Sequence, residues 1–187
     1  DNLTGYVNLL GNYHMPEDIT YEAYLREVGK SMKALSFDSY PFYEKNSVSG
    51  GLVNYLQSLG TISKVAREDG FAFWSCVQAG TDYRDNGEEG ATTGYLTQAQ
   101  ALWNVNTSLA FGAKGIVYFP LIQPTNYANV DGSTYDYNRN GIIGANNAVN
   151  AYYDDVQLAN KQIVAADEVL MKAQNKGVIA TEQAAVD

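Results

Sequence analysis

The sequence is poor in cysteine, histidine and proline, with one Cys, one His and four Pro among 187 residues. A single cysteine excludes an internal disulfide, and one cysteine with one histidine cannot assemble the familiar zinc sites. We therefore expect neither a metal site of that kind nor a cofactor. Cys76 lies inside an apolar stretch, which favours a buried, inert thiol over the nucleophile of a Cys-His pair. His14 is expected to be an ordinary loop residue.

Positive charge is also scarce, because 12 Lys and Arg face 21 Asp and Glu for a formal net charge of -9. Such a surface repels phosphates, so nucleic acid is excluded as a partner. No apolar run approaches the roughly 20 residues that cross a bilayer, and DNLTGYVNLL lacks the basic flank of a signal peptide. Tyrosine, in contrast, is abundant, with fifteen among the 187 residues. Tyrosine suits both protein interfaces and the stacking of sugar rings.

Apolar runs and helical periodicity alternate along the chain. Short buried strands are predicted at residues 5–10 (GYVNLL), 35–42 (LSFDSYPF), 71–78 (FAFWSCVQ) and 115–121 (GIVYFPL). Helices are predicted at residues 19–35, 50–70, 94–113 and 147–173, the first with Thr20 as its N-cap. Four strand-helix units whose strands are apolar on both faces predict a parallel sheet covered by helices.

Two α/β architectures accept this order: an open doubly wound sheet and part of a (β/α)8 TIM-like barrel. A whole barrel takes about 250 residues, and GNYHMPED after the first strand is not a glycine-rich phosphate turn. We therefore favour half of a barrel at residues 1–175, with residues 176–187 as a tail or the start of a following strand or domain. A self-standing open domain that binds another small molecule is the alternative.

Ligands of parallel sheets bind at the carboxyl ends of the strands. The residues expected there are polar or aromatic, which suits neutral hydroxylated ligands better than phosphates: Asn8, Tyr13, Asp38, Tyr40, Trp74, Gln78, Tyr118 and Gln123. Because side chains alternate along a strand, Trp74, Cys76 and Gln78 share one face. If that face points into the mouth, Trp74 offers a stacking platform and Gln78 a hydrogen-bonding tip. Alternatively, Trp74 belongs to the core and Asp38 caps a backbone amide.

One loop carries half of a calcium motif. DYNRNGIIGANN at residues 136–147 begins D-x-N-x-N-G, in which alternate oxygen ligands and a turning glycine wrap the ion. Its twelfth position is Asn147, which lacks the bidentate carboxylate. We therefore favour an ordinary loop over calcium.

Several segments together resemble a known family. LSFDSYPF, FAFWSCVQAG, SLAFGAKGIVYFPL and VDGSTYDYNRNG are similar to the second half of the sugar-cleaving barrels of glycosidase clan A, above all the family 42 β-galactosidases and their unclassified bacterial relatives. The resemblance implies strands five to eight of a barrel that handles β-linked, galactose-like sugars at the cell surface or outside the cell. It also implies a partner, the N-terminal half of the barrel, in the same precursor or in a second chain.

In that clan the acid/base glutamate follows strand four, which would precede Asp1, and the nucleophilic glutamate ends strand seven. FAFWSCVQ would be strand seven, so Gln78 stands at or within a residue of the nucleophile's place. Retaining hydrolysis needs two carboxyl groups about 5 to 5.5 Å apart, and an amide cannot form the glycosyl ester. Three hypotheses stay open. Asp38 or Glu88/Glu89 acts in another mechanism, Gln78 orients an acetamido group or a water, or the barrel binds glycan without turnover.

Overall fold

The structure is a computed structural model that describes residues 6–12, 15–42, 48–80, 96–122, 127–128, 134–135, 141–144 and 147–178. Along the chain it contains β1 Tyr6–Leu10, α1 Tyr21–Gly29, β2 Ala34–Asp38, α2 Val48–Asp69, β3 Ala72–Gln78, α3 Gln98–Ala110, β4 Gly115–Phe119, β5 Tyr127–Ala128, β6 Thr134–Tyr135 and α4 Tyr152–Lys172. The four predicted strand-helix units are therefore confirmed. Among the described residues, no helix has the length and apolar content needed to span a membrane.

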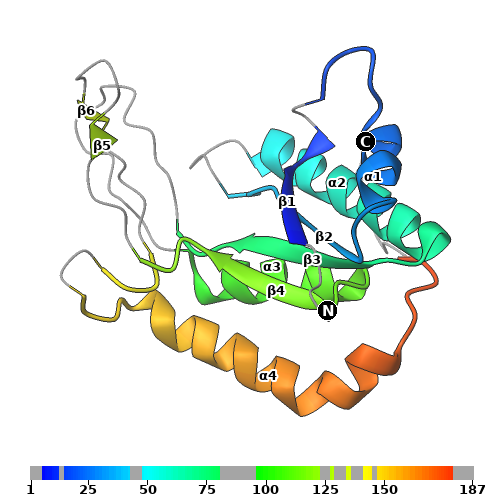
Figure 1. Cartoon of the computed structure of the whole chain (residues 1–187). Helices are drawn as coiled ribbons and strands as arrows, with labels where there is room; N and C mark the ends of the chain where they lie inside the picture. The colour runs from blue at the N-terminus through cyan, green and yellow to red at the C-terminus, as the bar shows by residue number, and fades with distance from the viewer. Residues whose placement is uncertain are drawn as a thin grey trace.

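The main sheet is parallel and has the strand order β1-β2-β3-β4, so that neighbours in sequence are neighbours in space (Figure 1). In register, Asn8 pairs with Ser36, Ser36 with Trp74, and Trp74 with Gly115. Beyond the four predicted strands, β5 and β6 form a short antiparallel pair. This pair lies away from the main sheet in Figure 1.

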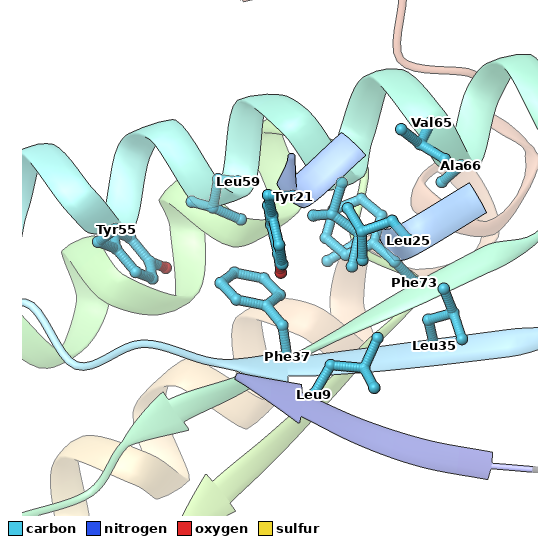
Figure 2. Packing of buried hydrophobic residues seen from close by; sticks show 12 residues of the cluster. Leu9, Tyr21, Leu25, Leu35, Phe37, Tyr55, Leu59, Val65, Ala66 and Phe73 are labelled. Atoms are coloured by element: carbon cyan, nitrogen blue, oxygen red, sulfur yellow. The ribbon is translucent and has the colours of Figure 1, made fainter. Parts of the chain in front are cut away.

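All four helices pack on one face of the main sheet. The largest core cluster joins Leu9, Phe37 and Phe73 of the strands to side chains of α1 and α2, as Figure 2 shows. Val77 and Ile116 meet α3 and α4 in a second cluster. Because strand side chains alternate, the remaining strand residues lie on the opposite face, which no described helix covers. We call this opposite face the open face.

Helix boundaries follow local capping chemistry. The Thr20 hydroxyl accepts a hydrogen bond from the Ala23 N–H at 3.2 Å, which confirms the predicted N-cap. The first helix ends at Gly29, earlier than predicted, because residues 34 and 35 already belong to β2. A Cβ on Gly29 would lie 2.9 Å from the Phe71 ring, so glycine permits this close approach. Thr97 and Gln100 form a capping box at the start of α3 that the sequence analysis did not predict.

Asn175, beyond α4, ties three helices together. Its Nδ2 donates to the Ala110 carbonyl at 2.6 Å, and its Oδ1 accepts from Ser63 Oγ at 3.4 Å and Arg67 Nη1 at 3.3 Å. Gly112 lies against it with φ at 95°, and a Cβ there would come within 2.8 Å of Asn175 Cβ. Asn175 can therefore pack this closely only because residue 112 is a glycine and has no side chain.

Gly112→Ala is therefore expected to lower the free energy of unfolding by about 1–3 kcal/mol, because alanine is strained at positive φ and also clashes. Thermal denaturation measures this change. Gly60→Ala in α2 is the matched control, because a Cβ there meets only the Phe111 ring at 4.0 Å. The control should be neutral or slightly stabilising. Equal stability of the two variants would contradict the prediction.

Candidate functional site

The carboxyl end of the open face combines a carboxylate, aromatic rings and a buried amide. Asp38 ends β2 and is paired in register with Cys76, while Gln78 ends β3 and is paired with Phe119. Tyr40 follows β2, and its ring stacks on the Phe119 ring with centroids 6.0 Å apart and planes 8° apart. Phe119 is 44% exposed, so this aromatic pair reaches the surface.

Asp38 is the carboxylate on the open face of the described strands. Its side chain is partly exposed, but Oδ1 is buried and has no hydrogen-bond partner. The expectation that Asp38 caps a backbone amide is thus not met for Oδ1. A buried carboxylate oxygen without a donor costs stability, so a group of this kind calls for an explanation in function or in a partner. Oδ1 itself is closed to solvent, so a ligand or another protein segment can contact only the exposed part of this side chain.

Cys76 lies beneath Tyr40, with the Tyr40 hydroxyl 3.7 Å from Sγ. Burial raises the pKa of the Cys76 thiol to about 11, the Tyr40 hydroxyl lowers it and the Asp38 charge adds to the rise. The thiol is therefore neutral near pH 7, which agrees with the prediction of a buried, inert cysteine. The open face offers no thiolate nucleophile here.

Stability is expected to fall as the pH rises above about 9. Burial raises the pKa of Cys76 to about 11 and that of Tyr55 to about 12, so the unfolded chain releases these protons at lower pH than the folded one. Each contribution is complete below the unfolded pKa and is lost as pH rises through the folded pKa. Denaturant unfolding between pH 7 and 11 checks this. Cys76→Ala should flatten the first part of the decline, and a flat profile in the wild type would contradict the prediction.

Gln78 is held entirely by backbone groups. Its Oε1 accepts from the Phe42 N–H at 3.0 Å, and its Nε2 donates to the carbonyls of Phe42 at 3.2 Å and Gly80 at 2.8 Å. The side chain is only 2% exposed, and the Tyr152 hydroxyl donates to the Gln78 carbonyl at 3.1 Å. Both amide hydrogens are used within the protein, so this side chain does not fit the predicted role of a hydrogen-bonding tip for a ligand.

Asn8, Ser36 and Trp74 lie on the open face but away from the strand ends. Ser36 Oγ donates to Asn8 Oδ1 at 2.7 Å, so these two side chains satisfy each other. Trp74 packs against Gly115, where a Cβ would lie 2.8 Å from the indole, and against Tyr6 with ring centroids 5.2 Å apart. Trp74 is partly buried and contacts neighbouring strands of the open face, so neither the stacking role nor the core alternative is decided.

The structure corrects the predicted position of Tyr118. We expected it at the mouth, but strand alternation places it on the helix-covered face, where its hydroxyl donates to Asn160 Oδ1 of α4 at 2.9 Å. Burial raises its pKa to about 12. Its neighbour Phe119, which pairs with Gln78, lies on the open face instead. The pairing of Gly115 with Trp74 sets this alternation, and the sequence alone does not reveal it.

The remaining predicted positions lie outside the described residues: Tyr13, His14, Glu88, Glu89, Gln123 and most of the 136–147 loop. Within the described part of the chain, no three His, Cys, Asp or Glu side chains are placed to hold a metal ion. The calcium hypothesis is not tested by that observation, because residues 136–140 are not among those searched.

One groove on the described surface lies away from the strand ends. It has a volume of about 460 Å³ and runs along α4, lined by Tyr153, Val156, Gln157, Asn160, Lys161, Val164 and Ala165. Val164 is 69% exposed there. Asn160 also binds Tyr118 of β4, whose outer edge has no partner strand in the described sheet. The groove therefore adjoins an open edge of the sheet rather than the candidate site.

No family model and no curated protein matches the sequence. Solved structures do match. They include β-galactosidases from the haloarchaeon Halorubrum lacusprofundi (15% identity, TM-score 0.56, 85% of this chain and 22% of that chain), G. stearothermophilus (a GH42 enzyme; 13%, 0.61, 90% and 23%) and Marinomonas ef1 (16%, 0.56, 89% and 25%). At these identities the likeness shows the fold alone. The chain has the α/β fold of part of a TIM barrel and spans about a quarter of the length of these relatives.

Proposed function

We propose that the chain is the C-terminal half of a glycoside hydrolase-like barrel that acts on β-linked, galactose-containing glycans. The single observation that carries the proposal is the match of 85–90% of the chain to three solved β-galactosidases. The partly exposed side chain of Asp38 and the stacked pair Tyr40 and Phe119 support it. A carboxylate beside an exposed ring suits a sugar, whose hydroxyls donate hydrogen bonds while its apolar face stacks on aromatics.

A complete site needs a second half of the barrel. The outer edges of β1 and β4 are unpaired in the described sheet, and Tyr6, Leu10 and Phe119 on the open face are about half exposed. Further parallel strand-helix units, in the same precursor or in a second chain, would pair with these edges and cover the apolar groove of α4. They would also supply the second carboxyl group that glycoside hydrolysis requires.

The second candidate function is glycan binding without turnover, and Gln78 favours it. The strand end that resembles the nucleophile's place holds a buried amide bonded to backbone, and Asp38 is the carboxylate on the open face of the described strands. A barrel of this kind keeps the sugar-stacking surface but lacks the nucleophile of a retaining mechanism. In both candidates Asp38 contacts sugar. Location outside the cytoplasm stays a prediction from the resemblance.

Incubation of the complete barrel, with the N-terminal half in the same precursor or as a second chain, with an aryl β-galactoside and with β-galactan oligosaccharides tests the proposal. Release of galactose supports hydrolysis, while saturable binding without release over long incubation supports the binding function. α-Galactosides of the same size are the control ligands and should be neither bound nor cleaved. Absence of both binding and release for every galactoside would overturn the proposed function and leave the barrel fold as the sole finding.

A further inference from the structure

The short segment that follows β2 and ends at Phe42 covers part of the open face. It comprises residues 39–42 and follows Asp38 directly. Ser39 and Tyr40 in it are 2% and 7% exposed, although they lie outside any helix or strand. The Tyr40 ring stacks on Phe119, and its hydroxyl lies 3.7 Å from Cys76 Sγ. The segment therefore closes the candidate site from one side.

Two anchors fix this segment. At its start, the parallel register of β2 with β3 places Asp38 beside Cys76. At its end, the Gln78 amide bonds both the N–H and the carbonyl of Phe42. Hydrogen bonds to both the N–H and the carbonyl of one residue restrain the two peptide groups on either side of its Cα, which a single bond would not do. The third bond, to the Gly80 carbonyl, fixes the amide plane of Gln78 itself.

We propose that Gln78 is a positioning residue that clamps residues 39–42 against the end of β3, so that Tyr40 stays over Cys76 and Asp38 stays at the mouth. Glutamine fits this task because it offers two N–H donors and one carbonyl acceptor at the end of a two-methylene arm. Glutamate has no donor when ionised, and asparagine is shorter by one methylene. This structural role of Gln78 does not depend on carbohydrate binding. Its consequence for contact between Asp38 and a sugar rests on the proposed function.

Cys76 is the sole cysteine of the chain, which makes it a built-in reporter of the segment's opening. We would measure the rate at which an aromatic disulfide reagent labels the folded protein at pH 8. Gln78→Met keeps the length and bulk of the side chain but removes all three hydrogen bonds. Local opening should then become more frequent, and labelling should be at least ~10-fold faster than in the wild type.

Gly112→Ala is the matched control, because it destabilises the fold at the turn between α3 and β4, at the amino end of the strands, and leaves the Gln78 bonds in place. Its labelling rate should stay within about twofold of the wild-type rate if Cys76 is exposed by local rather than global opening. Equal labelling of Gln78→Met and the wild type would overturn the proposal. An equal acceleration in Gly112→Ala would do the same, since global unfolding would then explain the exposure.

Amide hydrogen exchange on the wild type covers the case in which Gln78→Met does not fold. The Phe42 N–H should be protected at least ~10-fold relative to an unstructured peptide, because it donates to a buried acceptor. Exchange at the unstructured rate would refute the clamp. Glycan binding is measured separately. A wild-type protein that binds no galactoside would contradict the proposed function, whereas the labelling and exchange results would still decide the role of Gln78.

Discussion

Gln78→Glu is expected to destabilise the protein by about 3 kcal/mol or more at pH 7 and to create no galactosidase activity. A carboxylate oxygen in place of Nε2 would face the carbonyl oxygens of Phe42 and Gly80, at a position that is 2% exposed. Two hydrogen bonds would be lost, and a buried charge would lie against two partial negative charges. The substitution that makes the strand end look most like a hydrolase is thus expected to be harmful.

The loss in Gln78→Glu should depend on pH in a defined direction. Burial and the two carbonyls raise the folded-state pKa of the new carboxyl above its unfolded value of about 4.3. The folded state then binds the proton more tightly, so the deficit is smallest below about pH 4 and grows as pH rises. Urea unfolding at pH 4 and pH 7.5 measures both limits. A deficit that shrinks toward neutral pH would count against this environment for Gln78.

Gln100→Glu is the matched control for charge and shape. Gln100 is only partly buried in the capping box of α3, where its Oε1 accepts from the Thr97 N–H at 2.9 Å. Glutamate serves equally well at this place and interacts favourably with the helix N-terminus. The control should therefore unfold at the wild-type urea concentration or slightly above it. A similar loss in both variants would mean that the effect at Gln78 is not specific to its buried partners.

Asp38→Asn is expected to separate function from stability. If the protein hydrolyses galactosides, we expect the rate to fall by about 10²-fold or more, because an amide can neither exchange a proton nor stabilise positive charge on the sugar. The free energy of unfolding should stay equal or rise by up to about 1 kcal/mol, because the buried Oδ1 has no donor to lose. Turnover assays and urea unfolding on the same preparation measure both quantities.

Asp69→Asn provides the comparison for Asp38→Asn. Asp69 lies at the end of α2 and pairs with Arg26 of α1 at 2.5 Å, on the far side of the helix layer from the open face. The same chemical change there should leave galactoside turnover and binding unaltered. Full activity of Asp38→Asn would remove Asp38 from the catalytic machinery. If the wild type binds without turnover, a weaker glycan affinity of Asp38→Asn becomes the expected result.

Local patterns predicted the scaffold well because each depends on neighbours in the chain. The Thr20 cap, the apolar runs of the strands and the helical spacing of α2 involve residues a few positions apart, and the structure has each of these elements where it was expected. A helix boundary differed from the predicted one where a segment distant in sequence determined it. The first helix stops at Gly29 because residues 34–38 pair with β3, a distant segment that could not be read from the helix itself.

The candidate site was predicted less well, for a physical reason that Gln78, Trp74 and Tyr118 illustrate. Their residue types suit sugar binding, but their roles depend on which group lies opposite each side chain. Tyr118 turns toward Asn160, and Trp74 fills the space that Gly115 leaves. Alternation within a strand gives relative faces, whereas the choice of the helix-covered face is made by packing across the whole sheet.

By itself the sequence determined the order of strand-helix units, the parallel sheet and the absence of an internal disulfide. Periodicity depends only on residues close together in the chain, and the absence of an internal disulfide depends only on the number of cysteines. Tertiary structure alone decided that the Gln78 amide binds the backbone of Phe42, 36 positions away, and that Asp38 Oδ1 is left without a donor. Hydrogen bonds of this kind are set by the register of strands brought together by burial. A residue's type cannot fix its partner until the fold has fixed its neighbours.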